Sequence, residues 1–97
     1  MRLLAVLQSD CPTCRLITPY LGALAAGSVP LTAISQDPEA MTREFARQMD
    51  IQFPLELDTG LTLSRRLQVV TVPTLFVLDD RDRVVRQEAG FDKAALN

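Results

Sequence analysis

Hydrophobic residues occur in blocks along this chain, and the blocks alternate between two periodicities. Residues 3–7 form an unbroken apolar run, which is typical of a strand buried on both faces. The next block has helical spacing, with apolar side chains at Leu16, Ile17, Tyr20, Leu21, Leu24 and Ala25. We expect this helix to start near Pro12, to be kinked by Pro19 and to end at Gly27.

The alternation of strand and helix continues through the middle of the chain. Residues 29–34 predict a second apolar strand, a helix follows Pro38, and residues 53–57 predict a short third strand. Apolar residues at every fourth position are expected to form the buried stripe of this helix, namely Met41, Phe45 and Met49. A short third helix is expected over residues 61–67, with Arg65 and Arg66 on its outer face.

A hairpin and a last helix complete the pattern. Residues 74–78 have a strong β composition, and residues 84–88 return antiparallel after an acidic turn. Asp82 is expected at the left-handed position of that turn, which Asp tolerates. A short final helix is expected to begin at Phe91.

The resulting order is β-α-β-α-β-α-β-β-α, within one domain over residues 1–97. Strands that alternate with helices pair in parallel, and the closing hairpin adds an antiparallel edge. The pattern therefore predicts an α/β fold. We expect a three-layer sandwich around a central mixed sheet of four to five strands, truncated at the C-terminal helix.

Composition and charge narrow the class of protein. Hydrophobic residues make up 47% and charged residues 23%, which indicates a globular chain. The net charge of −2 offers no basic face for nucleic acid. No apolar run reaches the roughly 18–20 residues of a membrane span, and the apolar start lacks a signal-peptide cleavage pattern. We expect a cytoplasmic protein if the chain is complete, and a periplasmic or other extracytoplasmic one if it is a domain of an exported parent.

The chain has two cysteines and no histidine. The lack of His excludes Ser–His and Cys–His hydrolases and most zinc and copper sites. Cys11 lies where the first strand gives way to the helix, and the positive end of the helix favours its thiolate form. Cys14 follows one turn later on the same face. This spacing predicts a redox pair in which an accessible Cys11 attacks a partner disulfide and a shielded Cys14 resolves the mixed disulfide.

Three other interpretations of the cysteine pair stay open at this point. A structural zinc site needs four ligands, of which this chain supplies two, so the others would come from a second chain. A structural disulfide across one helical turn would constrain little of the unfolded chain. Two inert core cysteines are the third interpretation.

The chain resembles the thioredoxin superfamily over nearly its whole length. The resemblance rests on residues 11–14 at the strand-to-helix junction, Pro19 after them, residues 71–74 before a strand, and Gly90 after the hairpin. It implies that Pro73 is a cis-proline facing the cysteines, and that the backbone of Val72 pairs with an extended substrate. The expected site residues are catalytic Cys11 and Cys14, with Pro12, Thr13, Val72 and Pro73 binding the substrate.

A branch of the superfamily is also indicated. Residues 36–58 insert a helix and a strand before Pro73, which, together with Asp58 and residues 72–79, is similar to the TlpA-like branch. Residues 9–14 are also similar to the methylamine-utilisation thioredoxin-like proteins. Members of this branch reduce protein disulfides outside the cytoplasm. The resemblance therefore implies protein disulfide or dithiol substrates and an upstream redox donor. We expect no cofactor and no metal.

The chain departs from the family pattern at several positions beside the cysteines. Asp10 replaces the Trp that commonly precedes the first cysteine, and its charge is expected to oppose the helix-end effect, while Arg15 acts in the opposite direction. Ala5 and Ile17 stand where family members carry an acid. No acceptor for the proton of Cys14 is therefore evident from the sequence.

Other functions and partners remain as alternatives. A glutaredoxin-like, glutathione-linked enzyme suits Pro12 but not the inserted segment or the missing paired glycines. A peroxiredoxin-like peroxidase would need Thr or Ser at position 8, which is Gln. A copper chaperone lacks a His or Met ligand beside the cysteines. A non-catalytic binding module would hold a partner at the Pro73 groove. Because the final helix is cut short, the absent part is expected to leave an apolar strip, covered by a second copy of the chain or by parent-protein residues.

Overall fold

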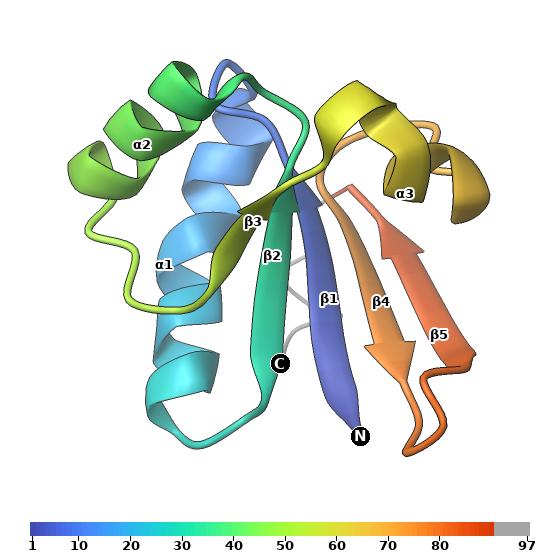
Figure 1. Ribbon diagram of the computed structural model, residues 1–97. Helices are drawn as coiled ribbons and strands as arrows, with labels where there is room; N and C mark the ends of the chain where they lie inside the picture. Colours follow the sequence, from blue (N-terminus) through green and yellow to red (C-terminus); the bar gives the residue numbers. More distant parts are fainter. Residues whose placement is uncertain (91–97) are drawn as a thin grey trace.

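Five strands form one mixed sheet at the centre of the molecule. The computed structural model describes residues 1–90 (Figure 1). The strands are β1 (Arg2–Leu7), β2 (Leu31–Ser35), β3 (Leu55–Leu57), β4 (Thr74–Leu78) and β5 (Val84–Ala89), in the spatial order β3-β2-β1-β4-β5. β1, β2 and β3 pair in parallel, whereas β4 is antiparallel to β1 and to β5. The predicted α/β fold and mixed sheet are therefore confirmed.

The helices cover the sheet on two sides and produce two hydrophobic cores. They are α1 (Pro12–Ala26), α2 (Glu39–Gln48) and α3 (Thr62–Arg66), the last preceded by the single 3₁₀ turn η1 (Thr59–Leu61). Alternate residues of β1 face opposite cores: Ala5 and Leu7 pack against α1, whereas Val6 packs on the side of α3. All three side chains are fully buried. The expectation that this strand is buried on both faces is confirmed.

The long helix α1 has the predicted ends. Cys11 is its N-cap in extended conformation, and Pro12 occupies the first helical position, where its missing N–H costs no hydrogen bond. Gly27 caps the other end, with its N–H bonded to the carbonyls of Ala23 and Leu24 at 3.1 Å. The helix runs continuously through Pro19, and its expected kink stays a prediction.

The predicted stripe of α2 is wrong at one position. Phe45 is buried and Met49 packs partly against the core, but Met41 is 46% exposed. The buried face is turned by one residue because Thr42 lies inward, where its hydroxyl contacts that of Ser35 at 2.7 Å. A polar residue on the buried face could not be recognised from hydrophobic spacing alone.

Smaller differences concern the ends of elements. The second strand is shifted to Leu31–Ser35, the third is shortened to Leu55–Leu57 after Pro54, and the third helix ends at Arg66. Arg65 and Arg66 are exposed as expected, and Asp82 has the predicted left-handed conformation with φ 60°. The helix expected from Phe91 lies outside the described residues.

The elements bring three segments to one end of the sheet. Because β1, β2 and β3 are parallel, their carboxyl ends meet at the upper edge in Figure 1, where α1 begins. The chain enters β4 at this same edge because β4 runs antiparallel to β1. The loop before β4 therefore lies beside the first turn of α1.

Candidate active site

Cys11 lies at the start of α1 with its sulfur in contact with two backbone groups. The backbone N–H of Cys14 donates to Sγ of Cys11 over 3.1 Å, as in an N-cap. The thiol of Cys11 in turn donates to the carbonyl oxygen of Val72 at 3.6 Å. Cys11 is half-buried, so its sulfur combines solvent access with a helix N-terminus.

Cys14 is fully buried one turn further along the helix. Burial, together with the nearby Cys11 thiol and the Asp10 charge, raises the pKa of Cys14 to about 12. Backbone hydrogen bonding from Gln8 acts on this pKa in the opposite direction. The expected contrast between an accessible first and a shielded second cysteine is confirmed, and both thiols are in the free form.

The loop before β4 holds the carbonyl that Cys11 contacts. The peptide bond between Val72 and Pro73 is cis, as the family resemblance implied. Thr74 closes the loop by donating its hydroxyl to the carbonyl of Thr71 at 2.6 Å. The carbonyl of Pro73 accepts the N–H of Gly90 at 2.7 Å, which joins the loop to the end of β5. The loop is therefore fixed at both ends, and Val72 lies between the attachments.

The remaining predicted site residues belong to the same two segments, the first turn of α1 and the loop before β4. Pro12 is exposed and Thr13 half-buried in the first turn of α1, between the two cysteines. Val72 is half-buried and Pro73 buried. The structure thus brings the two segments together, although they are 60 residues apart in the sequence, from position 12 to position 72.

Two charged residues, Asp10 and Arg15, flank the cysteine pair in the sequence. Asp10 is exposed and raises the pKa of Cys14. Arg15 extends toward α2, where its guanidinium donates to Gln48 at 3.1 Å and lies 5.3 Å above the ring of Phe45. The hydrogen bonds of this cation are therefore made with α2 and the preceding loop rather than with the sulfur of Cys11.

Sequence reasoning missed the polar residues that anchor the segment before Cys11. Arg15 donates through Nε to the carbonyl of Ser9 at 2.8 Å, and the N–H of Ser9 donates to Asp37 at 2.6 Å. Gln8 donates its side-chain amide to that of Gln36 at 2.6 Å. Isolated Gln and Ser residues in loops carry no periodic signal, so only the fold reveals that they meet.

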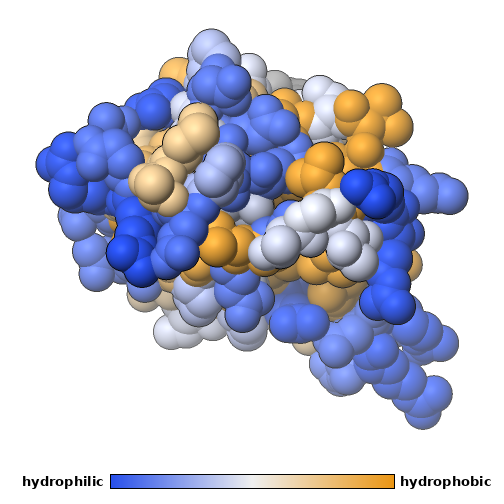
Figure 2. All heavy atoms as spheres, turned by 45° about the horizontal axis from the view of Figure 1, so that its top comes forward, coloured by the Kyte–Doolittle hydropathy of each residue, from blue (hydrophilic) through white to orange (hydrophobic). Residues whose placement is uncertain are grey.

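A shallow depression adjoins the Val72 carbonyl. Its volume is about 380 Å³. It is lined by uncharged side chains: Gln8, Gln36, Leu61, Val69, Val70, Thr71 and Val72. Val70 is 96% exposed at its rim. Figure 2, which brings the upper end of Figure 1 forward, shows apolar side chains gathered beside polar ones on this face. The surroundings of Cys11 therefore suit a protein surface better than a small charged ligand.

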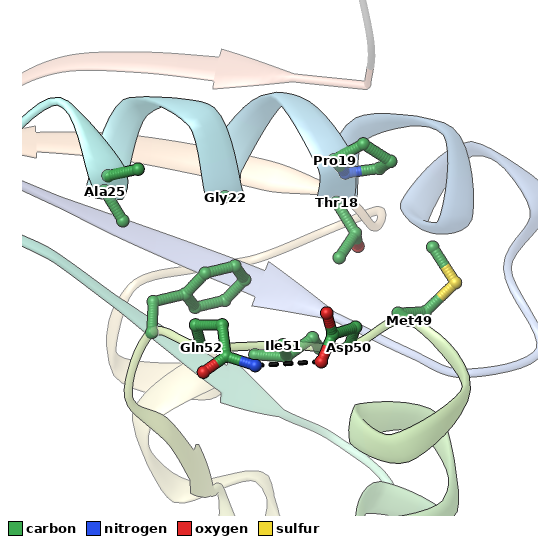
Figure 3. Close-up of a pocket in the computed structure, with 10 residues that line it drawn as sticks. Thr18, Pro19, Gly22, Ala25, Met49, Asp50, Ile51 and Gln52 are labelled. Carbon is green, nitrogen blue, oxygen red and sulfur yellow. Dashed lines mark hydrogen bonds between the residues drawn. The ribbon is translucent and has the colours of Figure 1, made fainter.

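A second hollow lies away from the cysteines, between α1 and the loop after α2 (Figure 3). It measures about 440 Å³. Gly22 and Ala25 line its helix side and Ile51 lies across from them. Thr18 borders this hollow and also donates its hydroxyl to the carbonyl of Cys14 at 2.7 Å. The small side chains of α1 account for the open space.

Residues 1–90 contain neither a candidate metal site nor a candidate membrane span. That part of the chain has no group of three or more His, Cys, Asp or Glu residues arranged to hold a metal ion. None of its helices combines the length and the apolar composition needed to cross a bilayer. The two free thiols remain the chemically reactive feature of this surface.

Comparison with known families and proteins agrees with this geometry. The model of the AhpC/TSA family matches residues 2–87. The thiol-disulfide oxidoreductase ResA of Bacillus thuringiensis subsp. konkukian is 26% identical over 85 residues, which are 82% of this chain and 49% of that protein. The sporulation thiol-disulfide oxidoreductase A of Bacillus subtilis is 24% identical over 90 residues, covering 84% and 54%. This chain spans about half the length of these curated relatives.

Solved structures confirm the thioredoxin-like fold. StoA from Bacillus subtilis superposes with a TM-score of 0.86 at 22% identity, over 97% of this chain and 76% of that one. The exposed lipoprotein thioredoxin Etrx1 of Streptococcus pneumoniae gives the same TM-score of 0.86 at 18% identity, over 97% and 77%. At these identities the likeness concerns the fold.

Proposed function

We propose that this chain, which belongs to the AhpC/TSA family, exchanges its Cys11–Cys14 dithiol with disulfides of other proteins. One observation carries the proposal. The half-buried sulfur of Cys11 lies between the N–H of Cys14 at 3.1 Å and the carbonyl of Val72 at 3.6 Å. The names of the curated relatives, all thiol-disulfide oxidoreductases, support the same reaction.

The first step is attack by Cys11 on a substrate disulfide. The thiolate of Cys11 forms a bond to one substrate sulfur, the substrate S–S bond breaks, and the departing thiolate takes up a proton. The N–H of Cys14 stabilises negative charge on Cys11 because it already points at that sulfur. Pro12 and Thr13 border the attacking atom, and the exposed position of Pro12 leaves room for a protein partner.

The second step releases the reduced substrate. Cys14 loses its proton and attacks Sγ of Cys11, so the Cys11–Cys14 bond forms while the bond to the substrate breaks. Burial of Cys14 keeps it protonated until this moment, which prevents the two thiols from competing for the substrate. An upstream dithiol donor then returns the pair to the reduced form by the reverse exchange.

The Val72 loop provides the binding surface in this proposal. An extended substrate segment that pairs with the backbone of Val72 would place its half-cystine beside Cys11, because the two groups are already in contact. The uncharged lining of the adjoining depression would accommodate apolar residues of the substrate.

The experiment is dithiothreitol-dependent reduction of insulin by the purified chain and by Cys11→Ser and Cys14→Ser variants. The intact chain is expected to accelerate reduction. Cys11→Ser should abolish the acceleration, and Cys14→Ser should accumulate mixed disulfides with the substrate. Activity that survives in Cys11→Ser would refute the proposal.

Two further assays separate this function from its alternatives. Turnover of a glutathione mixed disulfide or of a hydroperoxide, without insulin reduction, would favour a glutaredoxin-like or a peroxidase reaction. A chain without any of these activities that still binds a partner in Cys11→Ser would be a binding module. Titration of the Cys11–Cys14 couple against glutathione then measures its redox potential, which indicates the direction of electron flow.

A further inference from the structure

Asp10 is the one charged residue in the two segments that meet at Cys11. Residues 8–14 and 69–74 carry no other Asp, Glu, Lys or Arg. Asp10 lies in the turn between β1 and α1, directly before Cys11, and it is exposed. The depression beside the Val72 carbonyl is lined by uncharged side chains. A substrate that approaches the sulfur of Cys11 therefore meets a single charge from these segments, and that charge is negative.

Helix capping does not account for this carboxylate. An Asp at the start of a helix commonly accepts a backbone N–H of the first turn. Here Cys11 is the N-cap, and its sulfur accepts the N–H of Cys14 at 3.1 Å. Within residues 1–90, the carboxylate of Asp10 makes no hydrogen bond and no ion pair. The start of α1 is thus formed without the Asp10 side chain.

Arg15, the nearest cation in the sequence, is bonded elsewhere. Its Nε donates to the carbonyl of Ser9 at 2.8 Å, and a terminal nitrogen donates to Gln48 at 3.1 Å. Its guanidinium lies 5.3 Å from the centre of the Phe45 ring, against α2. Since Arg15 forms no ion pair with Asp10, the Asp10 carboxylate remains available to a charged group from outside the chain.

The main chain on both sides of Asp10 is held by hydrogen bonds. The N–H of Ser9 donates to Asp37 at 2.6 Å, and the carbonyl of Ser9 accepts the bond from Arg15. The carbonyl of Cys11 accepts the backbone N–H of Arg15 at 3.1 Å. None of these bonds involves the side chain of residue 10. A substitution at this position should therefore change the charge beside Cys11 while the turn keeps its conformation.

The charge of Asp10 is unfavourable for the thiol chemistry of the chain itself. Burial is the main cause of the raised pKa of Cys14, and the negative charge of Asp10 adds to it. The carboxylate therefore opposes thiolate formation at Cys14 while it neither caps α1 nor pairs with Arg15. An interaction that makes this charge favourable would have to come from another molecule.

We propose that Asp10 is a specificity-determining residue, which favours protein disulfides that carry Lys or Arg next to the half-cystine attacked by Cys11. This inference rests on the proposed function, because it concerns the substrate of that exchange. Asp10 and the Val72 carbonyl both adjoin Cys11, so a long side chain beside the half-cystine of a segment bound at Val72 can reach the carboxylate. A cation there is attracted to Asp10 and speeds the attack, whereas a carboxylate is repelled.

The test uses two peptides that differ only in carrying Lys or Glu next to a cysteine, each joined through a disulfide to 2-thiopyridine. The thiolate of Cys11 forms a bond to the peptide sulfur, the disulfide of the peptide breaks, and 2-thiopyridone leaves with the electron pair and takes up a proton. Its absorbance gives the rate. The ratio of the two rates cancels any effect of a substitution on the thiols, because both peptides react with the same thiolate.

The variants are Asp10→Asn, which removes the charge, and Asp10→Lys, which reverses it. Asp80→Asn is the matched control. It removes a carboxylate that is 96% exposed in the turn between β4 and β5, at the opposite end of the sheet from Cys11 (Figure 1).

The intact chain and Asp80→Asn are expected to react roughly three- to tenfold faster with the Lys peptide than with the Glu peptide at low salt. This ratio should approach one between about 0.01 M and about 1 M salt, where the screening length falls from roughly 30 Å to roughly 3 Å. Asp10→Asn should bring the ratio close to one at low salt, and Asp10→Lys should invert it.

Equal rates with both peptides in the intact chain, or a preference that Asp10→Asn leaves unchanged, would overturn the role of Asp10. Release of 2-thiopyridone that continues at the same rate in Cys11→Ser would instead refute the proposed function itself.

Discussion

The backbone N–H of Cys14 points at the sulfur of Cys11 from 3.1 Å, while the sulfur of Cys14 itself is shut away from solvent. Cys14 therefore donates a hydrogen bond to the Cys11 sulfur through its backbone, while its own thiol stays buried. The contrast arises because Cys11 is the N-cap of α1 and is only half-buried, whereas Cys14, one turn further along the helix, faces the core.

This contrast predicts the order of alkylation in the reduced protein. A short pulse of iodoacetamide should modify Cys11 at least about tenfold faster than Cys14, because Cys14 is buried and remains protonated. Mass spectrometry of the peptides after digestion measures both sites. In Cys11→Ser, Cys14 should become reactive only when the protein is unfolded. Faster modification of Cys14 in the folded protein would contradict the roles assigned to the two thiols.

The raised pKa of Cys14 also predicts how stability depends on alkaline pH. Its folded-state pKa of about 12 exceeds the ordinary value of 9.0, so between these values the unfolded chain has released a proton that the folded chain keeps. This contribution to stability is complete below pH 9.0 and is lost as the pH rises toward 12. The loss is at most about 1.4 kcal/mol per pH unit in that window.

Urea unfolding of the reduced protein at several pH values above neutrality measures this effect. Cys14→Ala should show a shallower decline of the unfolding free energy with pH than the unmodified chain, whatever its absolute stability. Parallel declines in the two proteins would show that Cys14 is not the group responsible.

Asp58 predicts the opposite behaviour in acid. Burial acts to raise its pKa, but the hydroxyl of Ser64 and the N–H groups of Leu63 and Ser64 outweigh it, so the pKa lies below its ordinary value of 3.8. The stabilisation is present above that value and is lost as the pH falls through the lowered one. Asp58→Asn should therefore cost about 1–3 kcal/mol at neutral pH and weaken the acid dependence.

Denaturant unfolding at neutral and acidic pH tests this prediction. Asp80→Asn is a suitable control, because the side chain of Asp80 is 96% exposed and its loss should change stability by less than about 0.5 kcal/mol. Equal effects of the two substitutions would contradict the structural role of Asp58.

Gly22 offers a stabilising substitution in the hollow beside α1. A Cβ at this position would meet no atom within 4 Å, and the residue lies inside the helix. Gly22→Ala should therefore raise the unfolding free energy by about 1 kcal/mol through helix propensity. Gly60→Ala should instead destabilise the protein, because Gly60 has φ +69°. Thermal unfolding of both variants checks the sign. A lower unfolding free energy for Gly22→Ala would contradict the prediction, because it would mean that the added methyl group is not accommodated in the hollow.

Local patterns in the sequence were enough to predict the helices and strands and the candidate pair of reactive cysteines. Apolar runs and helical spacing are local properties of the chain, so the strands, the helices and the position of Cys11 at a helix start could be predicted directly. The prediction failed at Met41, where spacing alone could not show that Thr42 would pair with Ser35 inside the core. The place of Pro73 beside the cysteines came from family resemblance rather than from local pattern.

Which polar side chains meet at the carboxyl edge of the sheet depends on how the chain folds in three dimensions. Gln8, Gln36 and Ser64 lie far apart in the sequence, and their hydrogen bonds form because parallel pairing brings the ends of β1, β2 and β3 to one edge. Polar contacts over such sequence separations leave no periodic trace in the chain. Which of these side chains meet depends on the register between the strands. The hydrophobic pattern shows which strand residues face the core, but it does not show which polar residue a loop glutamine will bond to.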